Sequence, residues 1–197
     1  GDDRENISMK ELTELFTVEK VHSSPARFDM KKLEAINGDK IRALTLDEFL
    51  TWTLPFLERA NVISGTPEEI ALVKKALPLI QERIVKLDEA PQLLKFLFVK
   101  EFTVDTEAVS KITDDGAKDI LKRSLKDLEA LTTWSHEAIE AVLRASLIEE
   151  MGLKPRIAFT ALRIATTGST ISPPLFESME LLGQAACLAR IAAALAL

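Results

Sequence analysis

The sequence predicts an all-α protein, an irregular helical bundle in two stacked helical subdomains, from three observations. Capping patterns that start helices recur along the chain, and the apolar residues between them follow helical spacing rather than strand alternation. Glycine is scarce, with 7 in 197 residues. No repeat of fixed period is present, which argues against a solenoid. We expect three divisions, residues 1–44, 45–100 and 101–197.

Helix starts are the clearest signals in the first half of the chain. In a capping box, a Ser or Thr and a Glu three residues later each satisfy a backbone N–H of the other. The boxes pair Ser8 with Glu11, Thr45 with Glu48, and Thr66 with Glu69. Asp29 is expected to cap a short helix over residues 30–36 that stops at Asn37 and Gly38. Pro78 should interrupt the helix that starts at Thr66 and let it restart.

Amphipathic stretches continue through the second half. They predict helices over residues 89–98, 114–131, 136–150 and 155–166. Ser172, Pro173 and Pro174 should then start a short helix that Gly183 ends, and an apolar helix should follow to the C-terminus. The plainest breaks between helical groups fall at residues 61–65 and 102–105.

The charge distribution permits local contacts with RNA but disfavours loose binding by a broad basic surface. The net charge is −6, and residues 101–150 carry 12 acidic against 6 basic side chains. The last 47 residues reverse this balance, with 4 basic and 2 acidic side chains. A phosphate backbone responds to the patch that it touches, so the acidic total does not exclude RNA.

Several protein classes are disfavoured by composition. No apolar run approaches the ~18 residues of a membrane span, and the charged residues 1–5 do not resemble a signal peptide. The single cysteine, Cys187, excludes an internal disulfide and fits a reducing compartment. Together, Cys187, His22 and His136 provide too few ligands for an ordinary zinc site. We therefore expect a soluble, cytoplasmic protein.

No constellation of catalytic residues is present in the sequence. The glycines are too widely spaced for a phosphate-binding loop, and neither a Cys/His pair nor a G-x-S-x-G elbow exists. Paired acidic residues are best interpreted as solvated residues at helix ends, because a negative charge near the N-terminus of a helix interacts favourably with the helix dipole. We expect no catalytic residue, no metal and no cofactor in this chain.

One segment, residues 152–177, is unusual for a purely structural helix. Arg156 and Arg163 lie seven residues apart and so share a helix face. A Thr/Gly/Ser turn and a rigid corner at Ser172, Pro173 and Pro174 follow. A donor-only cation beside a stiff apolar ledge is a suitable seat for an unstacked base. The alternative is simply a capped helix, a turn and another capped helix.

The same segment resembles the glutamyl-tRNA synthetase family of bacterial type. The downstream motifs are residues 154–159 (KPRIAF), 163–165 (RIA), 167–169 (TGS) and 172–183 (SPPLFESMELLG). The upstream motifs are residues 23–29 (SSPARFD), 32–33 (KL), 36–38 (ING) and 41–42 (IR). The two blocks occur in the family's order, and with the intervening helices they cover nearly the whole chain. The family's HIGH-like and KMSKS-like motifs are absent.

This resemblance implies a role for each division and for the whole. Residues 1–44 would end the stem-contact region, and residues 45–100 and 101–197 would form the first and second anticodon-binding subdomains. The parent class I aminoacyl-tRNA synthetase attaches glutamate to tRNA(Glu) with ATP and Mg, whereas this chain lacks the catalytic domain and is no enzyme alone. The implied partners are tRNA(Glu) and that N-terminal catalytic domain, not DNA or a membrane. The alternative is a stand-alone helical protein-interaction module.

The resemblance also implies individual RNA contacts. Arg83 stands where many members place an arginine against the third anticodon base. A guanidinium only donates, so it suits the acceptor edge of cytosine and not the N–H edge of guanine. Arg163 matches a second anticodon-reading arginine. The other implied contacts are Ser172, Pro173 and Leu175 at the corner, and Lys32 at the D-arm phosphates, to which helical spacing adds Arg156.

Further phosphate contacts by Lys40 and Arg42 would mainly position the RNA. Ala35 stands where some members have tryptophan, which weakens the case for stacking at that position.

Overall fold

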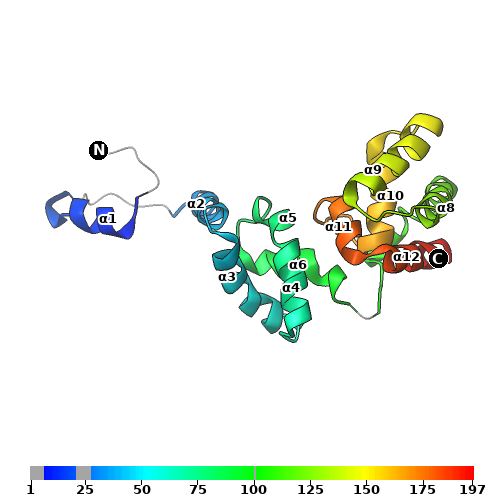
Figure 1. The fold of residues 1–197 in the computed structure, drawn as a ribbon. Helices are drawn as coiled ribbons and strands as arrows, with labels where there is room; N and C mark the ends of the chain where they lie inside the picture. Colours follow the sequence, from blue (N-terminus) through cyan, green and yellow to red (C-terminus); the bar gives the residue numbers. More distant parts are fainter. Residues whose placement is uncertain (1–6, 21–27, 100) are drawn as a thin grey trace.

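The computed structural model describes residues 7–20, 28–99 and 101–197, and over these ranges the regular elements are all helical. The all-α prediction is therefore confirmed. Figure 1 shows the elements following one another along the molecule, with α1 apart from two groups of packed helices. The upstream motif at residues 23–27 and the neighbouring His22 lie outside the described residues.

Helices α1 and α2 begin where the caps predicted, the short η1 between them was not predicted, and α2 ends later than expected. These elements are α1 (Met9–Leu15), the short 3₁₀ helix η1 (Val18–Lys20) and α2 (Met30–Arg42). The expected stop of α2 at Asn37 and Gly38 is wrong, because this pair packs against Val85. A Cβ on Gly38 would lie 3.1 Å from Val85 Cγ1, and the Asn37 amide donates to the Val85 carbonyl. Both residues thus serve a tertiary contact inside the helix.

The first helical group has its own hydrophobic core. Its elements are α3 (Leu46–Arg59), α4 (Pro67–Ala76), α5 (Pro78–Gln81), η2 (Leu87–Glu89), α6 (Ala90–Leu94) and η3 (Lys95–Leu97). The capping boxes at Thr45 and Thr66 are formed, and Pro78 starts α5 as predicted. Fully buried side chains include Phe49, Leu57 and Ile80.

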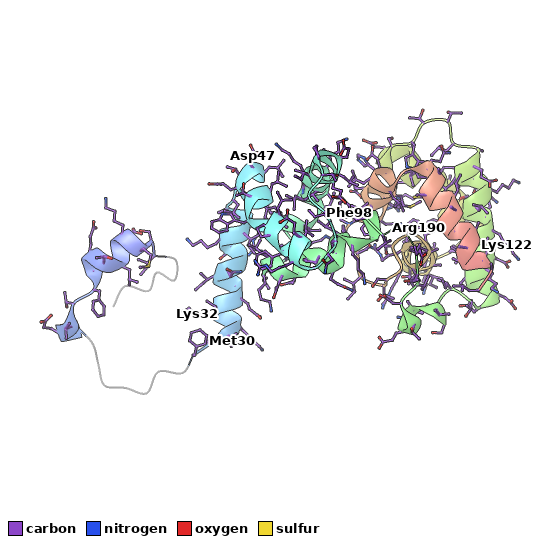
Figure 2. The ribbon with its side chains drawn as sticks, turned by 90° about the horizontal axis from the view of Figure 1, so that it is seen from below. Met30, Lys32, Asp47, Phe98, Lys122 and Arg190 are labelled. Atoms are coloured by element: carbon purple, nitrogen blue, oxygen red, sulfur yellow. The ribbon has the colours of Figure 1, made fainter. Side chains whose placement is uncertain are left out.

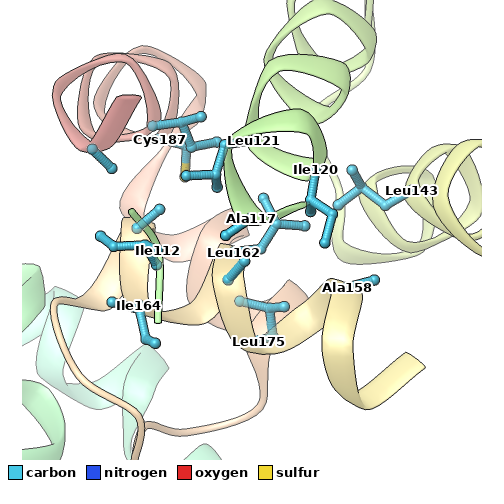
Figure 3. Packing of buried hydrophobic residues seen from close by; sticks show 14 of the residues in the cluster. Ile112, Ala117, Ile120, Leu121, Leu143, Ala158, Leu162, Ile164, Leu175 and Cys187 are labelled. Atoms are coloured by element: carbon cyan, nitrogen blue, oxygen red, sulfur yellow. The ribbon is translucent and has the colours of Figure 1, made fainter. Parts of the chain in front are cut away.

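The second helical group surrounds a separate core. Its elements are α7 (Thr106–Val109), α8 (Asp115–Glu129), α9 (His136–Leu143), η4 (Arg144–Glu150), α10 (Pro155–Thr167), α11 (Leu175–Leu182) and α12 (Gln184–Leu195). Figure 3 shows side chains of α8, α10 and α12 converging, among them Leu121, Leu162 and Cys187. The sequence did not predict α7, and η4 continues α9 as a π-helix.

The two groups are joined by α11, α12 and the backbone of residues 101–105. Helix α11 packs against α4, and Leu181 of α11 contacts the first core. In α12, Arg190 is only 8% exposed and donates from Nη2 to the Phe96 carbonyl at 2.8 Å (Figure 2). Its Nη1 donates to the Thr166 carbonyl at 2.7 Å, and its guanidinium lies 4.4 Å from the Phe102 ring centre. Arg190 is therefore a structural clamp across the joint.

A backbone contact fixes the segment that leads into the second helical group. Asp105 N–H donates to the Gly168 carbonyl at 2.8 Å, just after α10 ends. Gly168 has φ 81°, and a Cβ there would lie 2.6 Å from the Thr103 carbonyl oxygen. Only glycine fits this position without displacing backbone.

No single helix among the described residues is long and apolar enough to cross a membrane. The pair α11 and α12 meets that test of length and composition only when taken together, with a bend of 110° between them.

Candidate nucleic-acid interface

Arg83 lies on the short connection that follows α5, and the residues around it are firmly placed. Two residues earlier, the Gln81 amide donates to the Ile41 and Leu44 carbonyls at 3.0 and 2.9 Å. One residue later, Ile84 is fully buried in the first core. Between these two anchors the Arg83 side chain is exposed to solvent. In the described part of the chain it forms no ion pair.

Arg163 lies on the C-terminal half of α10 and holds the corner that follows this helix. Its Nη1 donates to the Pro173 carbonyl at 2.9 Å, to the Ser172 carbonyl at 3.4 Å and to the Ser172 hydroxyl. No acidic side chain of the described ranges pairs with it. These bonds all use one nitrogen, which leaves Nε–H and the Nη2 hydrogens to bind another group.

The positive charge of Arg83 acts on Arg163, although the two residues come from different helical groups. Burial lowers the pKa of Arg163 below its ordinary value, and the positive charge of Arg83 lowers this pKa further. Two cations whose charges interact favour the binding of an anion or of a group rich in hydrogen-bond acceptors. The pair therefore has the chemistry of a seat for a nucleotide.

The predicted corner residues are buried rather than exposed to solvent. Ser172 and Leu175 are each only 5% exposed, and Pro173 is also buried. The neighbouring Ile171 is 74% exposed and Pro174 is half-buried, so these two offer the apolar surface at the corner. Sequence reasoning passed over Ile171, although an apolar residue in an otherwise polar turn is a usable signal.

Lys32 and Arg156 lie away from the paired arginines. Lys32 is exposed in the first turn of α2, beside Met30, on the opposite side of the first group from α10 (Figure 2). Arg156 is exposed in the first turn of α10 and borders a hollow of about 550 Å³ that Lys111 also lines.

The two supplementary phosphate contacts differ in their availability. Lys40 is exposed, whereas Arg42 is bound by Asp39 at 2.6 Å.

Among the groups outside the predicted set, His136 and Cys187 have shifted pKa values. The Glu180 carboxylate accepts a hydrogen bond from His136 Nδ1 at 2.8 Å, and this bond raises the pKa of His136, as do the charges of Glu137, Glu180 and Glu177. Burial raises the pKa of the Cys187 thiol to about 12, so this thiol stays protonated and acts as a core residue. No cluster of three or more potential metal ligands was found among the described residues.

Comparison with known proteins yields consistent matches. A family model described as an anticodon binding domain matches residues 45–195. A glutamate–tRNA ligase of Nocardioides sp. is 47% identical over 197 residues, which cover 98% of this chain and 40% of that protein. The glutamate–tRNA ligase of Saccharopolyspora erythraea is 43% identical and is covered to 39%.

A solved structure shares the fold. The crystal structure of a glutamate tRNA ligase from Elizabethkingia meningosepticum superposes with a TM-score of 0.78 at 23% identity, covering 99% of this chain and 38% of that one. The chain thus spans about two fifths of the length of the proteins that it matches.

Proposed function

The chain belongs to the anticodon binding domain family, and we propose that it is the tRNA-reading part of a glutamate–tRNA ligase. In this proposal the ligase joins glutamate to tRNA(Glu), and ATP and Mg act in a catalytic domain that this chain does not contain. The expected compartment is the cytoplasm. The observation that carries the proposal is the match of the anticodon binding domain model over residues 45–195, within which the exposed Arg83 and the half-buried Arg163 have no acidic partner in the described ranges.

Arg83 supplies the discrimination between bases. Its exposed guanidinium can donate two hydrogen bonds to N3 and O2 of a cytosine in the third anticodon position. Guanine in the same position presents N1–H and N2–H donors, so donor would meet donor and both would lose their bonds to water. The anchors at Gln81 and Ile84 favour this role, because they fix the backbone on either side of Arg83.

Arg163 supplies rigidity as well as charge. It fixes the Ser172 and Pro173 carbonyls with one nitrogen and keeps the others for RNA. The buried residues Ser172, Pro173 and Leu175 then support the seat from behind, and Ile171 offers the exposed apolar edge. Lys32 and Lys40 on α2 would serve phosphates of the tRNA stem, well away from the anticodon.

The N-terminal elements support the proposal of a covalently attached catalytic domain. Helix α1 has no buried residue, and large apolar side chains are exposed in and just after α1 and at the start of α2. Met9, Phe16, Phe28 and Met30 are exposed by 77%, 60%, 72% and 57%. A run of large exposed apolar residues marks an interaction surface. In this proposal the rest of the ligase covers this apolar surface.

The alternative of a stand-alone protein-interaction module has less support. The match of the family model over residues 45–195 and the unpaired arginines both favour RNA.

A binding experiment with matched variants tests the proposal. An anticodon stem-loop RNA is titrated against the chain by fluorescence anisotropy, with cytosine or guanine as the third anticodon base. We expect cytosine to be preferred, and Arg83→Gln to remove about 1–3 kcal/mol of that preference without unfolding the protein. Arg59→Gln is the control, since Arg59 is an exposed arginine on α3 that contacts Phe56. Equal affinity of the unmodified chain for both RNAs would refute base reading by Arg83.

A further inference from the structure

A hollow of about 550 Å³ lies between the start of α8 and the first half of α10. Its lining combines apolar side chains with polar and charged ones. The apolar residues that line it are Ala117, Ile120, Leu153, Ile157 and Ala161. Its volume falls within the range of about 300–1,000 Å³ that is typical of small-molecule and cofactor sites. Ile157 is 56% exposed, so an apolar side chain faces solvent at this hollow.

Two cations flank the hollow. Lys111 and Arg156 both line it, both are exposed, and neither forms an ion pair in the described ranges. The acidic residue in the lining, Asp114, is engaged as the N-cap of α8 and accepts from the Ala117 N–H at 2.9 Å. Thr160, also in the lining, donates its hydroxyl to the Arg156 carbonyl at 2.6 Å. The lining therefore offers two cations without an ion-pair partner in the described ranges, beside one carboxylate that caps a helix.

The hollow is connected to the arginine seat by a single helix. Arg156 and Arg163 lie seven residues apart on α10, which places them on nearly the same face at a separation of about 10 Å along the axis. Stacked nucleotides advance by about 3.4 Å each along one strand, and unstacked ones by more. A strand that places a base at Arg163 therefore reaches the hollow within about three nucleotides.

We propose that this hollow receives a loop nucleotide that flanks the anticodon triplet, on the same strand as the base bound at Arg163. The base lies on the apolar wall beside Ile157, and its phosphate lies between Lys111 and Arg156. The inference rests on the proposed RNA-binding function and adds a second, separate contact to it. Stacking on an apolar wall accepts any base, so this site adds affinity and register but does not read sequence.

The test uses the whole 197-residue chain and an anticodon stem-loop RNA. The combined substitution Lys111→Ala and Arg156→Ala removes two phosphate contacts, and should lower the dependence of log K on log salt by about 1–2. Affinity at moderate salt should fall by about 5- to 50-fold. Lys126→Ala is the control, because Lys126 is an exposed lysine of α8 that does not line the hollow.

A second arm tests where the base lies. Ile157→Asn places a neutral polar amide at this exposed apolar position. It should weaken binding by about 5-fold or more, and should lose most of this effect on an RNA that is abasic at the flanking nucleotide. An unchanged effect on RNAs that are abasic on either side of the triplet would overturn the placement of the base.

The two proposals fail in distinguishable ways. If Arg83→Gln and Arg163→Ala weaken binding while the substitutions at Lys111, Arg156 and Ile157 leave it unchanged, the hollow has no role and the proposed function stands. If none of these substitutions changes RNA affinity, both proposals fail. Circular dichroism and thermal unfolding confirm that each variant is folded before it is titrated.

Discussion

Replacing Arg190 with methionine should loosen the joint between the two helical groups. Methionine keeps an unbranched apolar stem but removes the guanidinium, which donates to the Phe96 and Thr166 carbonyls and stacks on Phe102. Both carbonyls then lose their charged donor. Since Phe96 and Arg190 are 94 positions apart in sequence, this is a contact between the helical groups and not a local one.

The expected loss in the free energy of unfolding follows from the two hydrogen bonds and the cation–π contact of Arg190. Each hydrogen bond from a charged donor contributes about 1.5–3 kcal/mol, and a desolvated cation–π contact adds about 1–2 kcal/mol. Against this gain stands the cost of burying a charge, which also lowers the pKa of Arg190. The net loss in the free energy of unfolding should be about 3 kcal/mol. In a protein of this size that lowers Tm by roughly 6–12 °C.

Urea unfolding followed by circular dichroism measures the loss, and calorimetry shows whether the two groups still unfold together. Arg59→Met is the matched control, because Arg59 also stacks on a ring, that of Phe56 at 5.0 Å, but is exposed. Its effect should stay within about 0.5 kcal/mol. If Arg190→Met is equally mild, the clamp contributes nothing to stability and the reasoning fails.

Three further predictions concern single positions. Gly168→Ala should lower the free energy of unfolding, measured by chemical denaturation, by more than about 2 kcal/mol, because the new Cβ would lie 2.6 Å from the Thr103 carbonyl oxygen. Gly152→Ala is the control: its new Cβ meets no atom within 4 Å, so the free energy of unfolding should fall by only about 1–2 kcal/mol. Thr53→Val should leave stability unchanged or raise it by about 1 kcal/mol, because the buried Thr53 hydroxyl has no hydrogen-bond partner; a clear drop in Tm would show that an ordered water satisfies it. His136→Asn should be most destabilising below about pH 6.5, the ordinary pKa of histidine, because a raised pKa in the folded state stabilises only while the ring is protonated. The stability difference from the unmodified chain should shrink as pH rises through the folded pKa, and a difference independent of pH would contradict the contact with Glu180.

The helix starts were predictable because their signals are local. Each box joins residues three positions apart, and Thr45 and Thr66 form in the structure the bonds that the sequence implies. The end of α2 was not predictable, since the local stop signal at Gly38 yields to packing against Val85, 47 positions away in sequence. Tertiary contact overrides local preference in such cases.

The candidate site was likewise predictable only where its features are local in sequence. The spacing of Arg156 and Arg163 on one helix face follows from the sequence alone. The approach of Arg83 to Arg163 joins two helical groups, and no periodic pattern encodes it; only the family resemblance pointed to both residues. The burial of Arg190 was missed for the same reason, because its acceptors are backbone carbonyls at Phe96 and Thr166. The roles of the site residues in RNA binding stay predictions.

The position of the two seat arginines has a mechanical consequence. Arg83 belongs to the first helical group and Arg163 to the second, and the positive charge of Arg83 disfavours the charged form of Arg163. In the proposed function, an acceptor-rich nucleotide bound by both side chains would compensate both charges and hold the two groups together. If that proposal holds, RNA bound by both arginines should raise the stability of the arrangement of the two groups, and this stabilisation should be lost each time the RNA dissociates.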